Sequence, residues 1–379
     1  MILEGQTIPP DARSVLTIDL AALVANWRQI ADRVHPAACA GVVKADGYGL
    51  GITDVATALA RAGCSTFFVA TLAEGRAVRA ALPPAIVYVL DGLLPGAAAH
   101  YAAMDLRPCL SSLEEIREWA AWCAADSRPA PAAIHIDTGM QRLGLTAADV
   151  DTLAGPEREI LSTFPISLVM SHLACADVAA HPLNETQRTA FLALAQRLPR
   201  APLSLANSAG TFLDRAYHLD LVRPGIALYG GRASTDIPNP MRPVTRLSAR
   251  ILQVRTVAAG TPVGYAATFT APDARRIATV ASGYADGFLR ALSGPTERPG
   301  PLVTLDGHRV PVVGRVSMDV IALDVTGIPE REACRGAWVE LIGPTSGLDD
   351  LADHAGTIGY ELLTRLGRRS HRVVLDGSV

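Results

Sequence analysis

The sequence predicts an α/β protein in which a (β/α)8 TIM-type barrel is followed by a mostly antiparallel β domain. Two observations carry this prediction. Up to about residue 230, short apolar runs alternate with amphipathic helical stretches in about eight units of roughly 25 residues each. From residue 247 onward, apolar residues instead recur with a period of two, and Gly and Pro punctuate them. We therefore assign residues 1–243 to the barrel and 244–379 to the β domain.

The barrel part begins with a β-rich stretch over 14–20 and a helical stretch over 21–34. The strands that follow are short and apolar throughout, as expected of strands buried on both faces of a parallel sheet. After a strand that ends at Val43, we expect strands at 65–70, 85–90, 106–110, 132–136, 166–170, 203–205 and 221–229. We expect helices at 52–62, 71–82, 95–104, 111–125 and 185–198.

The β domain shows the alternation that is typical of antiparallel strands with one face toward solvent. Predicted strands cover 249–257, 276–281, 302–305, 310–313, 320–325 and 338–341. Two short helices are expected near 350–354 and over 361–366.

The composition excludes several classes of function. Hydrophobic residues make up 49% and charged residues 19%, which suits a well-buried globular enzyme rather than a disordered chain. The net charge of −3 gives no reason to expect nucleic acid or an anionic membrane as a partner. The six cysteines are scattered without a C-x-x-C pair, so we expect reduced thiols and no metal site. No signal peptide and no membrane-spanning apolar run are visible, which favours the cytoplasm.

The stretch 40–51 is the most informative part of the chain. Lys44 directly follows an apolar strand end, and three glycines and a tyrosine follow it: Gly47, Tyr48, Gly49 and Gly51. A Gly-rich turn between a strand and a helix directs free N–H groups at an anion. A desolvated lysine is a nucleophile that forms a Schiff base with an aldehyde. Together they suggest a phosphorylated aldehyde cofactor, although a lysine that reaches solvent beside an ordinary turn fits this stretch equally well.

Other polar residues follow the remaining predicted strands. In a (β/α)8 barrel, catalytic groups lie at the carboxyl ends of the strands. Taken singly, each residue could be a turn former, a helix cap or a core histidine. Their common placement on one rim favours a site made by Asp137, Thr138, Arg142, Ser171, His172, Asn207, Ser208, Arg223 and Gly225.

Two tyrosines in the β domain lie between small residues. They are Tyr265 within 263–269 and Tyr284 within 282–288. A tyrosine in such a setting is often only a turn or edge residue. Further polar breaks in apolar surroundings occur at 315–319, which contains Met318 and Asp319, and around Tyr360.

With these motifs in order, the chain resembles the alanine racemase family of fold-type III pyridoxal-phosphate enzymes over nearly its whole length. The motifs that carry the resemblance are Val43-Lys44-Ala45 with Tyr48-Gly49, Asp137-Thr138-Gly139-Met140 with Arg142-Leu143-Gly144, Ser171-His172, Asn207-Ser208, Val222-Arg223-Pro224-Gly225-Ile226, Leu228-Tyr229-Gly230, Gly264-Tyr265, Tyr284-Ala285-Asp286-Gly287, Met318-Asp319 and Gly359-Tyr360-Glu361. Any one of them is weak, but the ordered set is specific.

The resemblance implies a role for each of these residues. Lys44 would bind pyridoxal 5′-phosphate as a Schiff base and then act as one base, and Tyr265, from the partner subunit of a homodimer, would be the second. Arg223 would face the pyridine nitrogen, with His172 hydrogen-bonded between Tyr265 and Arg223. The phosphate would be held by Tyr48, Ser208, Gly225, Ile226 and Tyr360, and Asn207 would also bind the cofactor. Arg142 would contact the phenolic oxygen of the cofactor and Met318 the substrate carboxylate, with Tyr284 and Asp319 in support.

The chemistry of racemisation accounts for these residue types. A proton must leave one face of Cα and return to the other, which two bases on opposite faces accomplish. An arginine is always protonated, so Arg223 would keep the pyridine nitrogen unprotonated and suppress transamination. A cationic network through His172 and Arg223 would lower the pKa of Tyr265 so that it can act as a base.

The chain departs from the family pattern in three places. Asp46-Gly47 stands where Asn-Ala is frequent, and Ser317 replaces a frequent cysteine. His135 stands where many members carry a lysine, carbamylated in some, that orders the arginine corresponding to Arg142. A histidine cannot form that carbamate, so we expect another anion to hold Arg142.

The sequence leaves several functions open. The first is racemisation of alanine, for peptidoglycan or for catabolism. Others are a racemase of serine or lysine, a non-catalytic pyridoxal-phosphate carrier, and a fold-type III decarboxylase. The β domain argues against a carrier, and Arg223 at the place of an acidic residue argues against a decarboxylase.

Overall fold

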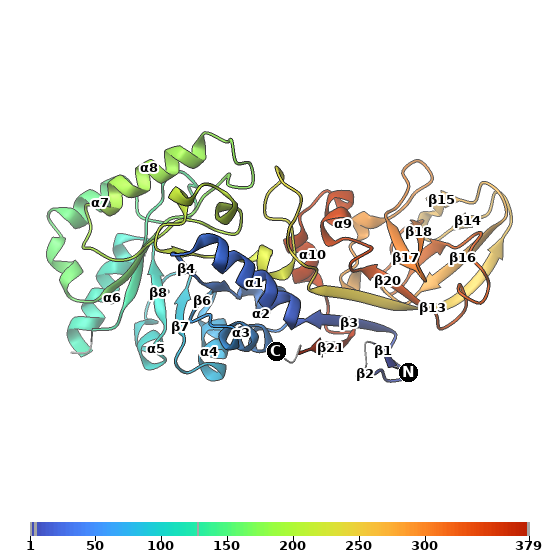
Figure 1. Ribbon diagram of the computed structural model, residues 1–379, viewed down its shortest axis with the longest axis horizontal. Helices are drawn as coiled ribbons and strands as arrows, with labels where there is room; N and C mark the ends of the chain where they lie inside the picture. Colours follow the sequence, from blue (N-terminus) through green and yellow to red (C-terminus); the bar gives the residue numbers. More distant parts are fainter. Residues whose placement is uncertain (1, 4–5, 127–128, 377–379) are drawn as a thin grey trace. The chain divides into compact units, whose positions relative to one another are not determined.

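The computed structural model describes residues 2–3, 6–126 and 129–376 (Figure 1). The chain separates into two compact units. One, here called the barrel unit, contains Leu23–Leu228 and Arg232–Met241. The other, here called the β unit, contains the N-terminal segment through Ala22, Tyr229–Gly231 and the chain from Arg242 onward.

The strands of the barrel unit form a closed parallel ring. They are β4 (Ala38–Cys39), β5 (Gly41–Val42), β6 (Thr66–Val69), β7 (Ile86–Val89), β8 (Arg107–Leu110), β9 (Ala132–His135), β10 (Ile166–Met170), β11 (Leu203–Ser204) and β12 (Leu221–Val222). β5 to β11 pair in chain order, and β12 pairs with β4. Amide bonds from Asp220 to the Leu203 carbonyl (3.1 Å) and from Arg223 to the Ala206 carbonyl (2.9 Å) join β12 to β11. Because only Ala40 separates β4 from β5, the ring has eight strands, which confirms the predicted barrel.

Helices alternate with these strands along the chain, and Figure 1 shows them around the strands. They are α1 (Leu20–Val34), α2 (Lys44–Tyr48), α3 (Ile52–Arg61), α4 (Leu72–Ala81), α5 (Ala98–Ala103), α6 (Leu113–Asp126), α7 (Ala147–Ala154) and α8 (Leu183–Ala195). Short 3-10 helices are η1 (Arg158–Ser162), η2 (Ala209–Phe212), η3 (Arg215–Tyr217) and η4 (Ile226–Tyr229). Phe67, Phe68 and Val69 are all fully buried, as expected of a strand covered on both faces.

The predicted strand over 221–229 is wrong beyond its first two residues. Only Leu221–Val222 is a strand, and the chain then turns into η4. The amides of Gly225 and Ala227 bond to the hydroxyl of Ser208 rather than to a neighbouring strand, so the ladder cannot continue.

The β unit is built on one eight-stranded sheet and two small hairpins. Its strands are β1 (Ile2–Leu3), β2 (Gln6–Thr7), β3 (Ser14–Asp19), β13 (Thr245–Val257), β14 (Pro262–Val263), β15 (Phe269–Thr270), β16 (Arg275–Val280), β17 (Leu302–Leu305), β18 (His308–Val313), β19 (Ile321–Asp324), β20 (Trp338–Ile342) and β21 (His371–Leu375). The sheet order is β16-β19-β18-β17-β20-β13-β3-β21, and β13 also pairs with β16. Every pairing in this sheet is antiparallel except that of β21 with β3, which confirms the mostly antiparallel domain.

Short helices complete the β unit. They are η5 (Tyr265–Ala267), η6 (Tyr284–Asp286), η7 (Arg290–Leu292), α9 (Leu348–Ala355) and α10 (Gly359–Arg365). The two α-helices fall where the sequence predicts them, each within a few residues of the expected bounds.

The N-terminal segment lies in a different unit from the one expected. We assigned 1–243 to the barrel, but β3 pairs with β13 and β21, and its Leu16 lies opposite Leu247. The barrel has its eight strands without it. Val15, Leu16 and Ile18 are fully buried, so the apolar pattern of β3 suits either sheet and cannot tell them apart.

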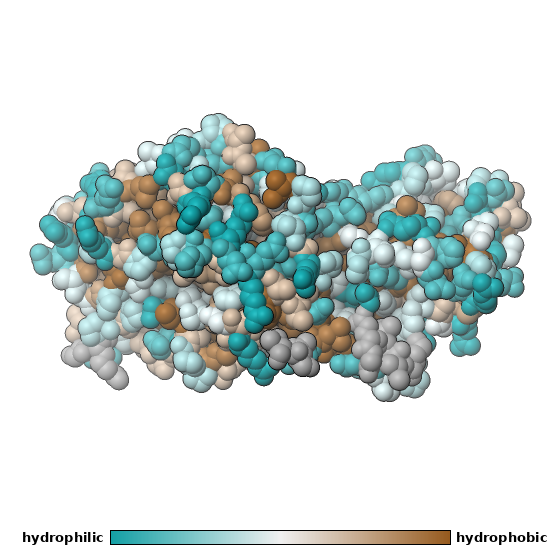
Figure 2. All heavy atoms as spheres, viewed as in Figure 1, coloured by the Kyte–Doolittle hydropathy of each residue, from teal (hydrophilic) through white to brown (hydrophobic). Residues whose placement is uncertain are grey.

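No helix among the described residues is long and apolar enough to cross a membrane. On the face shown in Figure 2, hydrophilic residues predominate and apolar ones are interspersed among them. Residues 2–3, 6–126 and 129–376 contain no cluster of three or more His, Cys, Asp or Glu side chains that could hold a metal ion.

Candidate active site

Lys44 stands at the carboxyl end of the first barrel strand. It follows β5 and the fully buried Val43, and it is the only lysine in the sequence. Burial lowers the pKa of its ammonium group, and the positive charge of Arg142 lowers it further, while the carboxylates of Asp91 and Glu74 oppose both effects. A lysine with a lowered pKa is a better nucleophile and base at neutral pH.

The turn after Lys44 is left-handed. Ala45, Asp46 and Gly47 have φ of 55°, 54° and 62° and ψ of 48°, 49° and 45°, which are the angles of a left-handed helix. Tyr48 continues it with φ of 56°. For each of the three non-glycine residues, Ala45, Asp46 and Tyr48, this conformation costs about 1–2 kcal/mol. The predicted Gly-rich turn is therefore present. Its backbone is strained, so contacts with neighbouring residues must stabilise it.

A cradle of hydroxyl and amide groups lies in the same unit. The Ser208 hydroxyl accepts hydrogen bonds from the amides of Gly225 (2.7 Å) and Ala227 (3.3 Å). Tyr48 is buried, and a Cβ added to Gly225 would lie 2.1 Å from the Tyr48 hydroxyl oxygen. The two hydroxyls form a set that fits a phosphate group together with the two amides, which here donate to the Ser208 oxygen and would donate to a phosphate oxygen in its place.

Two further residues predicted to bind the cofactor have structural contacts. Asn207 caps η2, because its Oδ1 accepts the Gly210 amide at 2.9 Å and its Nδ2 donates to the Leu173 carbonyl at 3.5 Å. Ile226 is fully buried at the start of η4. Of these two, Ile226 contributes to the cradle through its backbone position between Gly225 and Ala227.

The close packing of Gly225 gives a testable expectation. In Gly225→Ala, the new methyl group must displace Tyr48, and overpacking of this kind costs about 1–3 kcal/mol. We expect the affinity for pyridoxal phosphate, measured by spectroscopic titration, to fall by about 5- to 100-fold. Adding Tyr48→Phe removes the clashing oxygen, so it should recover part of the stability that Gly225→Ala loses in urea unfolding of cofactor-free protein. A double variant no more stable than Gly225→Ala would contradict this packing.

Arg223 is a buried cation without a carboxylate. It donates to the Ser204 hydroxyl, to the Ser171 carbonyl (2.7 Å) and to Nδ1 of His172 (3.4 Å), and its guanidinium lies 5.8 Å from the centre of the Phe68 ring. Burial lowers its pKa to about 10, so it stays charged at neutral pH. No acidic side chain in the described part of the chain pairs with it.

His172 is held neutral beside Arg223. Burial lowers its pKa well below the ordinary value, and the charges of Arg223 and Arg142 add to this. Since Arg223 donates to Nδ1, the ring proton is assigned to Nε2, which can donate to a further oxygen. His172 therefore accepts a hydrogen bond from Arg223 at Nδ1 and can donate another from Nε2.

Among the residues that the structure describes, Arg142 is held neither by His135 nor by the other anion that we expected. His135 is buried with Nδ1 3.3 Å from the Ser111 hydroxyl, and burial followed by the charge of Arg223 lowers its pKa to about 4. It is neutral at pH 7 and supplies no negative charge. Arg142 is exposed, and the structure gives it no hydrogen-bond or ion-pair partner among the residues that it describes.

The depressed pKa of His135 predicts a pH dependence of stability. The folded protein resists protonation down to about pH 4, whereas the unfolded chain takes up the proton near pH 6.5, so stability is lost as pH falls through this window. The loss from this group approaches about 3 kcal/mol at pH 4. Urea unfolding of wild type and His135→Asn should show the wild-type free energy of unfolding falling more steeply between pH 6.5 and 4; parallel curves would contradict it.

In the barrel unit, three site residues were not predicted from the sequence. Asp91 and Glu74 place negative charge near Lys44. Gln187, fully buried in α8, donates to the His172 carbonyl (2.9 Å) and accepts the Ala174 amide (2.9 Å), which holds the loop after β10. Only Glu74 had a visible signal, the capping-box spacing Thr71-x-x-Glu74.

Some polar residues on the predicted rim serve local structure. The Asp137 carboxylate accepts the amides of Gly139, Met140 and Gln141, which makes it a turn former. The hydroxyl of Thr138 bonds to that of Ser171 at 2.7 Å. These contacts shape the loop that leads to Arg142.

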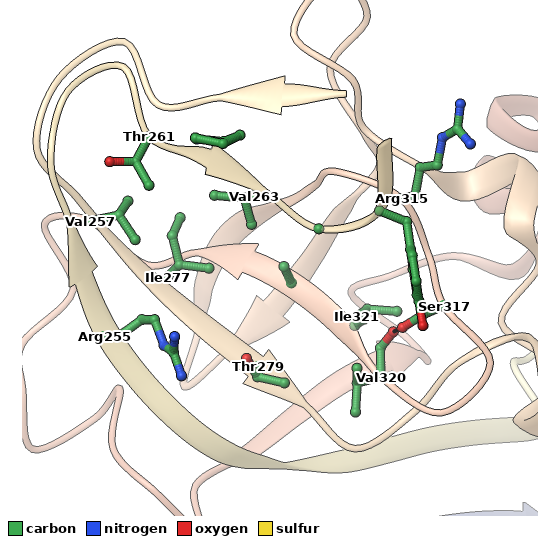
Figure 3. A pocket seen from close by; sticks show the side chains of 14 residues that line it. Arg255, Val257, Thr261, Val263, Ile277, Thr279, Arg315, Ser317, Val320 and Ile321 are labelled. Atoms are coloured by element: carbon green, nitrogen blue, oxygen red, sulfur yellow. Dashed lines mark hydrogen bonds between the residues drawn. The ribbon is translucent and has the colours of Figure 1, made fainter. Parts of the chain in front are cut away.

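Tyr265 lies in the β unit on a strained and exposed turn. It follows Gly264, which has φ of 78°, and precedes Ala266, which has φ of 58°. Its side chain is 71% exposed. Beside this turn is a cavity of about 600 Å³, and Figure 3 shows Val263, Ile277 and Ile321 on its walls. The turn thus presents the tyrosine outward rather than packing it against its own unit.

Tyr284 and Met318 are held side by side in the β unit. The Tyr284 amide bonds to the Ser317 carbonyl (3.0 Å), and the Ala285 amide bonds to the Met318 carbonyl (3.1 Å). A Cβ on Gly283 would lie 2.3 Å from the Ser317 carbonyl oxygen, so only glycine permits this approach. Both side chains are exposed.

A network of charged side chains, centred on the buried Asp286, supports the loops that carry Tyr284 and Met318. The Asp286 carboxylate, fully buried, lies 3.5 Å from Nε of Arg369 and 4.0 Å from Nη2 of Arg13, and it accepts the Gly283 amide at 2.9 Å. Asp319 pairs with Nη1 of Arg369 at 2.8 Å. Asp319 therefore has a supporting position. Asp286 belongs to a motif named from the sequence, whereas Arg13 and Arg369 were not predicted. The structure places Tyr360 on α10, half exposed.

The comparisons with known proteins cover both units. The family model described as the N-terminal domain of alanine racemase matches residues 18–233, and that of the C-terminal domain matches 244–374. This chain belongs to the alanine racemase family. A protein of Methylobacterium sp. (strain 4-46) named alanine racemase is 51% identical over 98% of this chain and 99% of its own length. One of Methylobacterium nodulans with the same name is 50% identical over 96% of each.

A solved structure gives the same result for the fold. The alanine racemase from Bartonella henselae, described as having covalently bound pyridoxal phosphate, matches with a TM-score of 0.91 and 40% sequence identity. The match covers 96% of this chain and 100% of that one. Membership of the alanine racemase family therefore agrees with the resemblance seen in the motifs.

Proposed function

We propose that this protein interconverts L- and D-alanine with pyridoxal 5′-phosphate, using Lys44 and Tyr265 as its two bases. The observation that carries the proposal lies in the barrel unit. There, a single half-buried lysine, a phosphate-fitting cradle and a buried arginine without a carboxylate occur together at the carboxyl ends of the strands. The names of the relatives and the bound cofactor of the Bartonella henselae protein support it.

The cofactor would be held by residues that fit its parts. Tyr48, Ser208, Gly225, Ile226 and Tyr360 would hold the phosphate, and Asn207 would also contact the cofactor. When bound, the cofactor supplies covalent activation of the amino group and spreads the charge that develops at Cα. Arg223 can only donate, so it would keep the ring nitrogen unprotonated. This limits the delocalisation that favours transamination.

The proton transfers fall to residues with suitable charge states. A neutral Lys44 would take or return the Cα proton on one face, and the Tyr265 hydroxyl would do so on the other. His172 would connect Arg223 to Tyr265 by hydrogen bonds. Its Nδ1 accepts from Arg223, and its Nε2–H would donate to the hydroxyl oxygen of Tyr265. Arg142 would contact the phenolic oxygen of the cofactor, and Met318 the substrate carboxylate through its main-chain amide.

We further propose a cytoplasmic homodimer in which the partner subunit supplies Tyr265. In the β unit, four predicted site residues are exposed or nearly so: Tyr265, Tyr284, Met318 and Tyr360. Two of them, Tyr284 and Met318, are held side by side, and exposed aromatic and apolar side chains that lie together are typical of a surface that another molecule covers. A second copy of this chain, related by two-fold symmetry, would give each subunit one complete site.

One experiment tests the function directly. Purified protein is reduced with borohydride and digested, and the cofactor adduct is located by mass spectrometry. Because Lys44 is the only lysine, the adduct must fall on Lys44 or on the N-terminal amine. We expect it on Lys44; an adduct confined to the N-terminal amine, or none, contradicts the assignment.

A chiral assay of the same protein with L-alanine, L-serine and L-lysine separates the possible activities. We expect D-alanine to form fastest. Faster racemisation of serine or lysine would show that alanine is not the preferred substrate. Release of carbon dioxide would indicate a decarboxylase, and bound cofactor without turnover would indicate a carrier.

A further inference from the structure

The left-handed turn after Lys44 needs an external support. Within the turn, the Gly47 amide bonds to the Val43 carbonyl (2.9 Å) and the Gly49 amide to the Ala45 carbonyl (2.7 Å). As in any single helical turn, the first amides have no acceptor inside it. Two of those first amides belong to Ala45 and Asp46, the two residues that directly follow Lys44.

The carboxylate of Glu74 supplies that support from the neighbouring strand–helix unit. Its Oε1 accepts the amides of Ala45 (2.7 Å) and Asp46 (3.4 Å). Its Oε2 accepts the amides of Ala70 (2.9 Å) and Thr71 (3.3 Å), at the start of α4. One side chain thus clamps the turn after Lys44 to the end of β6, with one oxygen on each side.

A neutral side chain cannot replace this clamp. Four N–H groups converge on two oxygens, and a carboxylate is the side-chain group that offers two acceptors without a donor. Hydrogen bonds to an ionised acceptor are also about twice as strong as neutral ones. In glutamine, one of the two positions becomes an NH₂ group that faces two amide donors.

We propose that Glu74 is the positioning residue of Lys44. By holding the strained turn, it fixes the direction in which the lysine side chain leaves the strand end, and its charge stabilises the ammonium form. This inference rests on the proposed role of Lys44. It goes beyond that role because Glu74 is not proposed to touch substrate or cofactor. Glu74 acts on Lys44 only through the turn.

The electrostatics agree with the geometry. Glu74 and Asp91 raise the pKa of Lys44 against burial and the charge of Arg142, which lower it. Glu74 also raises the pKa of Asp91, after burial, which raises it most. Glu74 is therefore part of the group of charges that sets how much of Lys44 is neutral at a given pH.

The test uses Glu74→Gln and a matched control. Asp149 occupies the same capping-box position in α7, where it bonds to Thr146, and it makes no contact with the Lys44 turn. Asp149→Asn therefore removes an equivalent capping charge elsewhere in the barrel. Amide hydrogen exchange of cofactor-free protein then reports on each turn separately.

We expect the peptide over 44–51 to exchange about tenfold faster in Glu74→Gln and at the wild-type rate in Asp149→Asn. The peptide over 146–150 should show the reverse. Unchanged exchange over 44–51 in Glu74→Gln overturns the proposal, because the turn would then be held by its own contacts.

A second readout separates positioning from plain structural support. Protein labelled with ¹³C-lysine gives a single lysine side-chain signal, because Lys44 is the only lysine. Its pH titration in cofactor-free protein should move to lower pH in Glu74→Gln and stay unchanged in Asp149→Asn. In the holoenzyme, kcat should fall by about 10- to 100-fold with a smaller change in KM. Wild-type values of both the titration and kcat overturn the proposal.

Failure of this inference and failure of the proposed function can be told apart. Exchange and titration are measured without cofactor, so they test Glu74 even if Lys44 carries no cofactor. Failure of the function appears instead in the wild type, as borohydride reduction without an adduct on Lys44. Glu74→Asp keeps the carboxylate on a side chain that is one methylene shorter. It should recover part of the kcat that Glu74→Gln loses.

Discussion

A hybrid dimer made of one Lys44→Ala chain and one Tyr265→Ala chain should recover about half of the wild-type activity, although each parent is nearly inactive. If the partner subunit supplies Tyr265, one site of the hybrid collects both lesions and the other collects none. If each chain builds its own site, every site carries one lesion and no activity returns.

The hybrid is best prepared by co-expression with two different affinity tags, which avoids relying on slow subunit exchange. Asp149→Asn paired with Lys44→Ala serves as the control, and it should give about half activity only if Lys44→Ala chains fold and assemble normally. A purified hybrid as inactive as its parents would rule out the shared site. The proposal of two bases would then need Tyr265 to reach the barrel of its own chain.

Arg223→Glu should slow racemisation by about 10²-fold or more and raise the proportion of transamination. A carboxylate at this position favours a protonated ring nitrogen, which stabilises the fully delocalised charge that leads to transamination. Racemisation is followed by chiral assay, and transamination by the pyruvate formed per D-alanine. An unchanged ratio would remove the proposed role of Arg223.

The structure also predicts a cost in stability for Arg223→Glu. The arginine donates to the Ser171 carbonyl and the Ser204 hydroxyl, and a buried glutamate leaves both without their donor. Arg79→Glu is a matched control in the same unit, because Arg79 also donates to main-chain carbonyls, those of Met104 and Asp105. It should lose stability without changing the ratio of transamination to racemisation.

Much of the barrel could be predicted from local pattern. Short apolar runs between helical stretches identified its strands, and Lys44 falls at the end of the first because a charged residue cannot continue a strand buried on both faces. The region 221–229 could not be predicted in the same way. Its apolar residues fit a strand, but a side chain from another loop, Ser208, takes the amides that a strand would use.

The two arginines at the rim show the same limit. Both were named from the sequence, but their surroundings differ. Arg223 is buried with three acceptors, while Arg142 is exposed without a partner among the described residues. The anion expected beside Arg142 is not supplied by His135, which is neutral. Burial of this kind depends on which loops meet, and spacing along the chain does not contain that information.

The sequence by itself determined the fold class, the family and the residues that could carry the chemistry, because each depends on local order: periodicity, strand ends and motifs in a given succession. Only the tertiary structure decided which sheet β3 joins, since a strand buried on both faces suits either. It also decided that Glu74 clamps the turn after Lys44. Those two residues are thirty positions apart, and the four hydrogen bonds of Glu74 run to amides, which every residue but proline carries and which therefore leave no mark in the sequence.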